Sequence, residues 1–246
     1  RGGLFCPEEI TLEPRTAVHR IRQYLEEQKG LDYYPQVLAT EVEVIGDSCQ
    51  VVASDGRVFY ADQVLICSGY EFQTLFPKEY AQSDLQACKL QMLLLEPQPT
   101  QVIPGSILTG LSIRRYESFS ECPSYPAIKA KEAPDSIAKK WSVHILFKQA
   151  VDGSVILGDT HEYADASDAE SLGTLIREDM NRFMLDEAAK IFELQNWNVR
   201  ETWIGTYSQC KNSDIFRKTI DGRIHLLTGI GGKGMTGSAG YAAAHL

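Results

Sequence analysis

Apolar residues early in the chain recur first with a helical period and then with the shorter period of strands. Spacings of three and four residues predict a helix over residues 14–29, with Pro14 in its first turn and Gly30 as a left-handed cap. Strands are expected next, at about 36–45 and 49–54. The first fifth of the chain is therefore expected to be a helix followed by paired strands.

Two turn signals follow these strands. Asp55-Gly56 is typical of a hairpin turn and leads into a further strand at 57–61. The next strand, Val64–Cys67, is continuously apolar and ends in Ser68-Gly69. Such a run predicts a parallel strand that is buried on both faces.

The middle of the chain predicts hairpins and a proline-rich loop. Strands are expected at about 88–95, 106–112, 141–148 and 154–159. The last two flank Asp152-Gly153 and form a second hairpin. The loop before them holds Pro123, Pro126 and Pro134.

A capping signal and a glycine-rich run mark the last third of the chain. Residues 167–170 have capping-box spacing and predict one long amphipathic helix that ends near Leu194. Further strands are expected at 198–208 and 223–228. Residues 229–240 hold six glycines in twelve residues and lead into a helix of small residues.

The order of these elements predicts the fold class. The outer parts of the chain have an α/β pattern, and the middle has hairpins plus one helix. The predicted fold is therefore α/β (α+β), with one domain interrupted by an inserted domain that is mainly antiparallel sheet.

Charge and composition exclude several classes of protein. Lys plus Arg is 24 and Asp plus Glu is 33, which gives a net charge of −9 without any basic run, so we expect no nucleic-acid partner. The longest apolar runs are only strand-sized, so no membrane span is expected. Six scattered cysteines without a C-x-x-C pair predict reduced thiols in a cytoplasmic protein. The chain lacks an initiator Met and a signal peptide, and we interpret it as a fragment.

The glycine-rich run carries the strongest chemical signal. Residues 228–237 follow an apolar strand and open a helix, a geometry that directs backbone N–H groups and the helix dipole at an anion. The run is not a Walker loop, because Gly234-Met235 follows the lysine. It is also not a complete dinucleotide fingerprint, because no βα unit with a ribose-binding acid follows. Tight helix–sheet packing without any ligand is the alternative interpretation.

Together with its neighbours, this run resembles a known family. The strand A-D-x-V-L-I-C-S-G (61–69) and the loop T-G-I-G-G-K-G-M-T (228–236) are similar to those of the FAD-dependent amine and amino-acid oxidase superfamily, which includes glycine oxidase, sarcosine oxidase and D-amino acid oxidase. The resemblance covers nearly the whole chain. Members of the family begin with a βαβ unit whose G-x-G-x-x-G motif holds the FAD pyrophosphate, and this sequence has no such motif. The chain therefore resembles the C-terminal two thirds of such an enzyme.

The resemblance implies a division into domains and a set of cofactor-binding residues. Residues 1–84 and 209–246 would form the FAD-binding domain, and 85–208 the substrate domain. Val42 matches the position that meets the adenine, and Lys233 would stabilise the anionic reduced flavin unless it is a solvated surface lysine. The implied FAD-binding residues are Val42, Cys67, Ser68, Gly69, Gly229, Gly231, Gly232, Lys233, Gly234, Met235 and Thr236.

Two departures from the family pattern concern the flavin and the substrate. Gly205 stands where covalently flavinylated relatives carry a cysteine, so we expect non-covalent FAD. Tyr207 and Thr236 stand where relatives place a carboxylate-binding Arg or Lys. A simple amino-acid substrate would then require its charge partner to come from elsewhere, with Arg114, Arg115 and Lys211 as the candidates.

Three residues are candidates for catalysis, namely His161, Tyr207 and Thr236. His161 lies where relatives place an active-site His or Tyr, although a strand-end histidine bonded to structure is an equal alternative. Tyr116 and Tyr163 line the pocket or pack beside it, and His19, His144 and His225 are interpreted as structural. No His/carboxylate metal cluster is recognised, so no metal is expected.

The resemblance implies oxidation of a C–N bond of an amine or amino acid-like substrate to an imine. A narrower alternative is an N-methylated aminophosphonate, since G-D-T-H-E-Y (158–163) resembles a subgroup associated with aminophosphonate breakdown. A non-catalytic flavin-binding module, or an inactive fragment, is the alternative from another class. The expected partners are a small-molecule amine and a second copy of the chain in a homo-oligomer.

Overall fold

The computed structural model describes residues 3–113 and 117–245. The chain divides into two compact units. The first contains Arg1–Tyr33, Leu90–His161 and Leu175–Ile204, and the second contains Tyr34–Lys89, Glu162–Thr174 and Gly205–Leu246. Three long strands run from one unit into the other, namely β5 (Leu85–Leu95), β8 (Val155–Asp165) and β9 (Val199–Cys210).

The first unit contains the β7–β8 hairpin, which is part of a five-stranded sheet. The strand order is β6-β7-β8-β5-β9, with β6 at Ser106–Leu108 and β7 at Leu146–Gln149. The β7–β8 hairpin pairs Leu146 with Gly158 and Gln149 with Val155, which confirms the second predicted hairpin.

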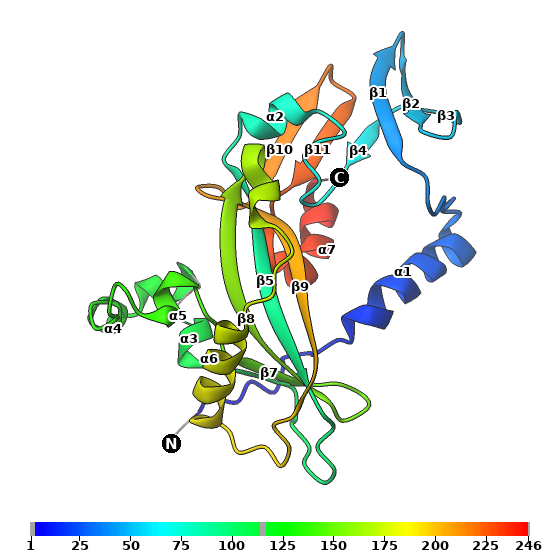
Figure 1. Ribbon diagram of the computed structural model, residues 1–246. Coiled ribbons are helices and arrows are strands. Elements are labelled where there is room, and N and C mark those ends of the chain that lie inside the picture. Colours follow the sequence, from blue (N-terminus) through cyan, green and yellow to red (C-terminus); the bar gives the residue numbers. More distant parts are fainter. Residues whose placement is uncertain (1–2, 114–116, 246) are drawn as a thin grey trace. The chain divides into compact units, whose positions relative to one another are not determined.

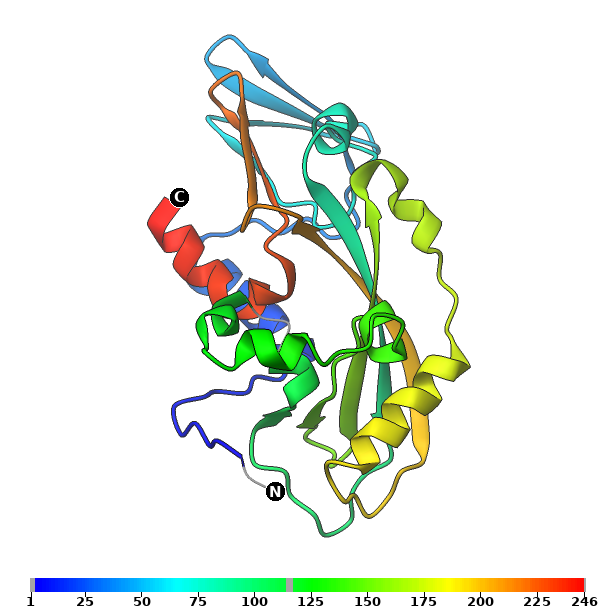
Figure 2. The ribbon, with the colours of Figure 1, turned by 90° about the vertical axis from the view of Figure 1, so that its left-hand side faces the viewer.

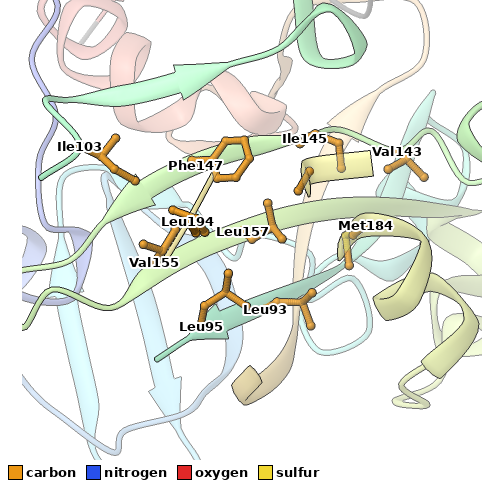
Figure 3. Packing of buried hydrophobic residues seen from close by; sticks show 11 residues of the cluster. Leu93, Leu95, Ile103, Val143, Ile145, Phe147, Val155, Leu157, Met184 and Leu194 are labelled. Carbon is orange, nitrogen blue, oxygen red and sulfur yellow. The ribbon is translucent and has the colours of Figure 1, made fainter. Parts of the chain in front are cut away.

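Helix α6 (Glu178–Ala189) lies along one side of these strands (Figure 2). Its Met184 and Ala188 are fully buried and join the core of the first unit, whose packing is drawn in Figure 3. The other buried members are Leu93, Leu95, Ile103, Val143, Ile145, Phe147, Val155, Leu157 and Leu194. These side chains alternate along their strands, so one sheet face forms the core.

Helix α1 (Pro14–Lys29) confirms the first predicted element. Its first turn is capped by the Glu13 side chain, which accepts a hydrogen bond from the backbone N–H of Arg15. Gly30 closes the helix in the left-handed conformation, at φ 71°. None of the helix residues is buried.

The prediction of one long helix from 167 to 194 is wrong, because this segment forms two separate helices. A 3₁₀ helix, η2 (Ala166–Leu172), ends at Gly173 with φ 53° and ψ −167°, which a helix cannot continue through. Gln91 then holds the backbone of Arg177 from both sides, accepting from its N–H at 2.8 Å and donating to its C=O at 2.9 Å. This pairing fixes an extended residue directly before α6 begins.

The strand predicted over 106–112 is also too long. Thr109 still donates its N–H to the carbonyl of Ile145, the residue directly before β7, but the chain then turns into α3 (Gly110–Ile113). The Ser112 hydroxyl donates to the same Ile145 carbonyl at 3.1 Å, so the helical turn is also held to that residue. The predicted proline-rich loop contains short helices, η1 (Glu117–Glu121), α4 (Tyr125–Lys129) and α5 (Ile137–Lys140).

The second unit contains two three-stranded sheets (Figure 1). The antiparallel sheet β1-β2-β3 consists of Ala39–Ile45, Ser48–Ala53 and Val58–Ala61, as the sequence predicts. The other sheet has the order β10-β11-β4, formed by Phe216–Ile220, Ile224–Thr228 and Val64–Ile66. Strands β4 and β11 are parallel, which confirms the predicted direction of β4.

Burial of β4 on both faces is not observed. Ile66 is buried, but the side chain of Leu65 is 43% exposed, because β4 is the last strand in the order of its sheet and covers the core with one face only. Strand β10 was not predicted. It pairs with β11 through the Asp221-Gly222 turn, in which both residues have positive φ.

Three helical segments complete the second unit. These are α2 (Pro77–Ala81), the 3₁₀ turn η3 (Gly231–Lys233) and α7 (Gly234–His245), the expected small-residue helix. The core of this unit contains Cys49, Ile66, Phe72, Tyr80, Leu85, Ala87, Ala166, Ile224 and Leu226.

The mixed α/β class with antiparallel sheets is confirmed. The three predicted domain segments stay a prediction. The two compact units group residues 1–33 with the middle of the chain rather than with 34–84. Within the described part of the chain, no helix combines the length and the apolar character needed to cross a membrane. None of the six cysteines, all of which lie within the described residues, forms a disulfide.

Candidate functional site

The second unit has a cavity where two loops meet at one sheet edge. Because β4 and β11 are parallel, the turn after β4 and the glycine loop after β11 leave the sheet at the same end. The cavity between these loops has a volume of about 420 Å³. Its lining residues are Cys67, Gly69, Tyr70, Thr206, Tyr207, Ser208, Ile215, Leu227, Thr228, Gly229, Ile230, Gly231, Ser238, Tyr241 and Ala242.

A chain of hydrogen bonds ties the cavity walls together. The Thr228 hydroxyl donates to the Gly69 carbonyl at 2.6 Å, and this carbonyl can only accept. The Ser208 hydroxyl must therefore donate to Thr228 Oγ1, at 2.7 Å, and it accepts from the Gly229 N–H at 3.1 Å. The bonds run in one direction from Gly229 to Gly69 and hold strand β9 against both loops.

Close packing explains part of the glycine content of this loop. Gly229 has φ +82°, and a Cβ there would lie 2.6 Å from Leu85 Cδ2 and 2.8 Å from Cys210 Sγ. Gly231 has φ +68°, and a Cβ would lie 3.3 Å from Cβ of Gln209. At Gly69, in contrast, φ is +65° and the space beside the backbone is open. Packing therefore requires Gly229, whereas Gly69 leaves free space on the cavity side.

The first unit has a second cluster of polar side chains. His144, Asp159 and His161 are all buried, and one ligand atom from each lies within 4.8 Å of the others. His161 Nδ1 lies 3.1 Å from the Ser142 carbonyl, so it carries the proton and donates it. The backbone N–H of His144 donates to the Asp159 carbonyl at 2.7 Å, which holds the two strands in register.

Comparison with protein families identifies the chain. Residues 1–245 match the DAO family, described as FAD dependent oxidoreductase. The chain belongs to this family. The resemblance inferred from the sequence is therefore confirmed, and FAD is the cofactor of the family.

Three solved structures share the fold of this chain. Glycine oxidase from Geobacillus kaustophilus has a TM-score of 0.57 at 12% identity, over 86% of this chain and 47% of that one. Glycine oxidase from Bacillus cereus ATCC 14579 has a TM-score of 0.55 at 14% identity, over 84% and 47%. L-amino acid deaminase from Proteus vulgaris, with its specific insertion deleted, has a TM-score of 0.54 at 15% identity, over 88% and 45%.

The chain spans about half the length of these three structures. Comparison with curated proteins gave no significant match. At these identities the structures establish only the fold of this chain.

The residues at the cavity fit part of the family's cofactor. A volume of about 420 Å³ lies in the range of small-molecule sites, at its smaller end. Leu227, Ile230 and Tyr241 provide apolar and aromatic surface, as a flat ring system requires. The cavity therefore fits the flavin ring of FAD in size and in lining.

The implied FAD-binding residues divide into two groups. Cys67, Gly69, Gly229 and Gly231 line the cavity, together with Tyr207. The remaining implied residues are described by the structure but do not line it: Val42, Ser68, Gly232, Lys233, Gly234, Met235 and Thr236. Tyr207 still reaches the glycine loop, because a Cβ on Gly232 would lie 3.8 Å from its hydroxyl.

Three of the residues outside the lining have other contacts. Val42 packs against the core of the second unit. The Ser68 hydroxyl lies 3.3 Å from the Tyr80 hydroxyl. Lys233 forms an exposed ion pair with Asp214 at 2.9 Å. Thr236, on the first turn of α7, is exposed.

Of the other residues that the sequence analysis named near the substrate, the structure describes Lys211 and Tyr163. Lys211 forms an ion pair with Asp165 at the surface of the second unit. Tyr163 is 37% exposed on β8. Arg114, Arg115 and Tyr116 lie outside the described residues.

The cavity lining also includes residues that the sequence analysis did not single out. Ser238, Tyr241 and Ala242 have the spacing of one helix face, so their shared side could have been read from the sequence. The Cys67 thiol faces the same cavity, and its partial burial raises its pKa, so it is a neutral thiol at neutral pH. The cluster of His144 and Asp159 with His161 was not predicted, because His144 lies 15 and 17 residues before the other two along the chain.

Proposed function

We propose that this protein oxidises a C–N bond of an amine or amino acid-like substrate to an imine, with FAD as its cofactor. The observation that supports this most directly is the cavity, which joins the turn at Cys67–Gly69 to the glycine loop at Gly229–Gly231. These are the two motifs by which the sequence resembles amine and amino-acid oxidases. The solved structures that share its fold include enzymes named glycine oxidase and L-amino acid deaminase.

When bound, FAD supplies the hydride acceptor for such an oxidation. The chain's own task is then to hold the substrate and to exclude water. Tyr207 carries the polar group best placed for this, because its ring lines the cavity and its hydroxyl lies near the glycine loop. Apolar neighbours such as Leu227 lower the local dielectric constant, which strengthens a hydrogen bond from the Tyr207 hydroxyl.

Roles for Thr236 and His161 stay proposals. Thr236 lies on the first turn of α7, where an exposed hydroxyl can donate to a substrate oxygen. His161 belongs to the first unit and is buried, with Nδ1 bonded to Ser142. We also propose that FAD is bound without a covalent link, because Gly205 stands where flavinylated relatives carry cysteine.

The visible spectrum of the purified chain is the first test. We expect a flavin absorption band that survives desalting after FAD is added, and complete release of the flavin into the supernatant after acid precipitation. Flavin retained in the acid pellet would contradict non-covalent binding. A folded full-length protein that never retains flavin would contradict the proposed function.

Substrate oxidation is tested by anaerobic bleaching of the flavin band with a panel of amines. The panel contains glycine, sarcosine and an N-methylated aminophosphonate, because Tyr207 and Thr236 replace the usual carboxylate-binding side chains. Turnover of glycine or sarcosine far above that of the aminophosphonate would reject the narrower substrate. Bleaching by none of these amines, with flavin bound, would favour a non-catalytic module.

The Tyr207→Phe variant tests the role of the hydroxyl. We expect slower bleaching by roughly 10-fold or more, since one donor to the reacting groups is lost. The matched control is Tyr60→Phe, because Tyr60 is 67% exposed on β3 and belongs to the same unit. Equal rates in both variants would show that Tyr207 has no catalytic role.

A further inference from the structure

We propose that His144, Asp159 and His161 form a binding site for a divalent transition metal ion, with zinc as the best fit. The three side chains are 3–12% exposed, and no other part of the proposed oxidation uses His144 or Asp159. Two imidazoles and one carboxylate are a common ligand set for zinc with an open fourth position. The cluster lies entirely within the first unit.

The distances place both histidines beside one carboxylate. His144 Nδ1 lies 3.5 Å from Asp159 Oδ1, and His161 Nε2 lies 3.6 Å from Asp159 Oδ2. One ligand atom from each of the three side chains lies within 4.8 Å of the other two. Ligands at about 2.0–2.1 Å from zinc in a tetrahedron are about 3.3–3.4 Å apart, so small side-chain movements suffice for the three donors to share one ion.

The surroundings of His161 fix the nitrogen that would bind the metal. Its Nδ1–H donates to the Ser142 carbonyl at 3.1 Å, so Nε2 is left with a lone pair directed towards Asp159. Metal-bound histidines usually donate their other N–H to such a carbonyl, which sets the tautomer and the ring orientation. The His161 backbone N–H also donates to the Trp141 carbonyl at 2.8 Å, so the main chain is held as well.

A cavity gives an ion access to the cluster. It has a volume of about 340 Å³ and reaches His144 and Ser142, with Lys129, Lys131, Glu132 and Lys139 also in its lining. A three-ligand zinc site keeps a fourth position for water or another ligand. Glu132 pairs with Lys129 at 2.8 Å, and the remaining excess of lysine ammonium groups favours a negatively charged fourth ligand over a neutral one.

Zinc content and cobalt spectroscopy of the untagged full chain test the site. After treatment with EDTA and dialysis, we expect the protein to take up one zinc ion per chain by elemental analysis. Cobalt(II) should give the intense visible absorption of a tetrahedral complex. Uptake well below one zinc per chain, or the weak spectrum of octahedral cobalt, would overturn the proposal without relying on any variant.

Variants locate the ion. Asp159→Asn keeps the shape of the side chain and His161→Asn removes the imidazole, and we expect each to weaken zinc binding by at least about 100-fold in a titration calorimeter. The control is His19→Asn, because His19 is exposed on α1 in the same unit. Zinc affinity unchanged in both cluster variants, with far-ultraviolet circular dichroism like that of the parent, would place the ion elsewhere and overturn the assignment.

Discussion

Replacing Gly229 by alanine should destabilise the second unit more than any comparable glycine substitution there. The new methyl group would lie 2.6 Å from Leu85 Cδ2 and 2.8 Å from Cys210 Sγ. Leu85 is 1% exposed and belongs to the core, so its side chain can move only by disturbing that core. The backbone adds strain, because alanine must adopt a φ of +82°.

The magnitude follows from these two terms. Left-handed strain for a non-glycine residue costs about 1–2 kcal/mol, and overpacking of a well-filled core costs about 1–3 kcal/mol. Lower entropy of the unfolded alanine chain offsets about 0.4–1 kcal/mol. We therefore expect Gly229→Ala to lower the free energy of unfolding by about 2–4 kcal/mol.

Two further glycines separate the terms in a urea unfolding assay followed by circular dichroism. Gly222 has φ +71° with open space around it, so Gly222→Ala carries the strain without the clash and should cost about 1 kcal/mol. Gly240 lies inside α7 with open space, so Gly240→Ala should stabilise by about 0.5–1 kcal/mol. A loss for Gly229→Ala no larger than that for Gly222→Ala would refute the packing argument.

Two charged groups give further predictions. Glu162→Gln should cost about 2–3 kcal/mol in urea unfolding, because it removes the carboxylate that lies 2.8 Å from the buried Lys89 ammonium. Lys89 Nζ also donates to the Leu172 carbonyl at 2.7 Å, and no loss in the variant would show that this bond is enough to hold the charge. Hydrogen bonds from Ser154, with help from Arg200, lower the pKa of Asp152 to about 2. Its stabilising contribution is therefore complete above pH 4 and is lost as the pH falls from 4 to 2. The stability advantage over Asp152→Asn should shrink across this window, and an unchanged difference would contradict the assignment.

Local signals in the sequence were enough to predict elements whose structure depends only on residues close together in the chain. The helix at 14–29 followed from its periodicity, from Pro14 and from Gly30, and each of these acts within a few residues. The hairpin around Asp152-Gly153 followed in the same way. The Asp221-Gly222 turn carried an equally local signal, and β10 was missed because that signal was not used.

Elements fixed by distant partners could not be predicted in this way. The helix expected over 167–194 has good amphipathic spacing, yet the chain breaks at Gly173 and Gln91, far away in the sequence, holds the backbone of Arg177. Strand β4 reads as fully buried, but its exposure depends on its position at the end of a sheet.

The sequence by itself determined the family, through two motifs whose spacing is local, and it named residues at the turn after β4 and in the glycine loop. Tertiary structure alone decided which of them line the cavity, because the parallel pairing of β4 with β11 brings the two loops to one edge. It likewise decided that His144 and Asp159 meet His161, since only the antiparallel register of β7 and β8 places these residues together. The spacing of residues within a motif indicates the chemistry of one segment. Contacts between segments depend instead on strand register and burial, which the motif does not contain.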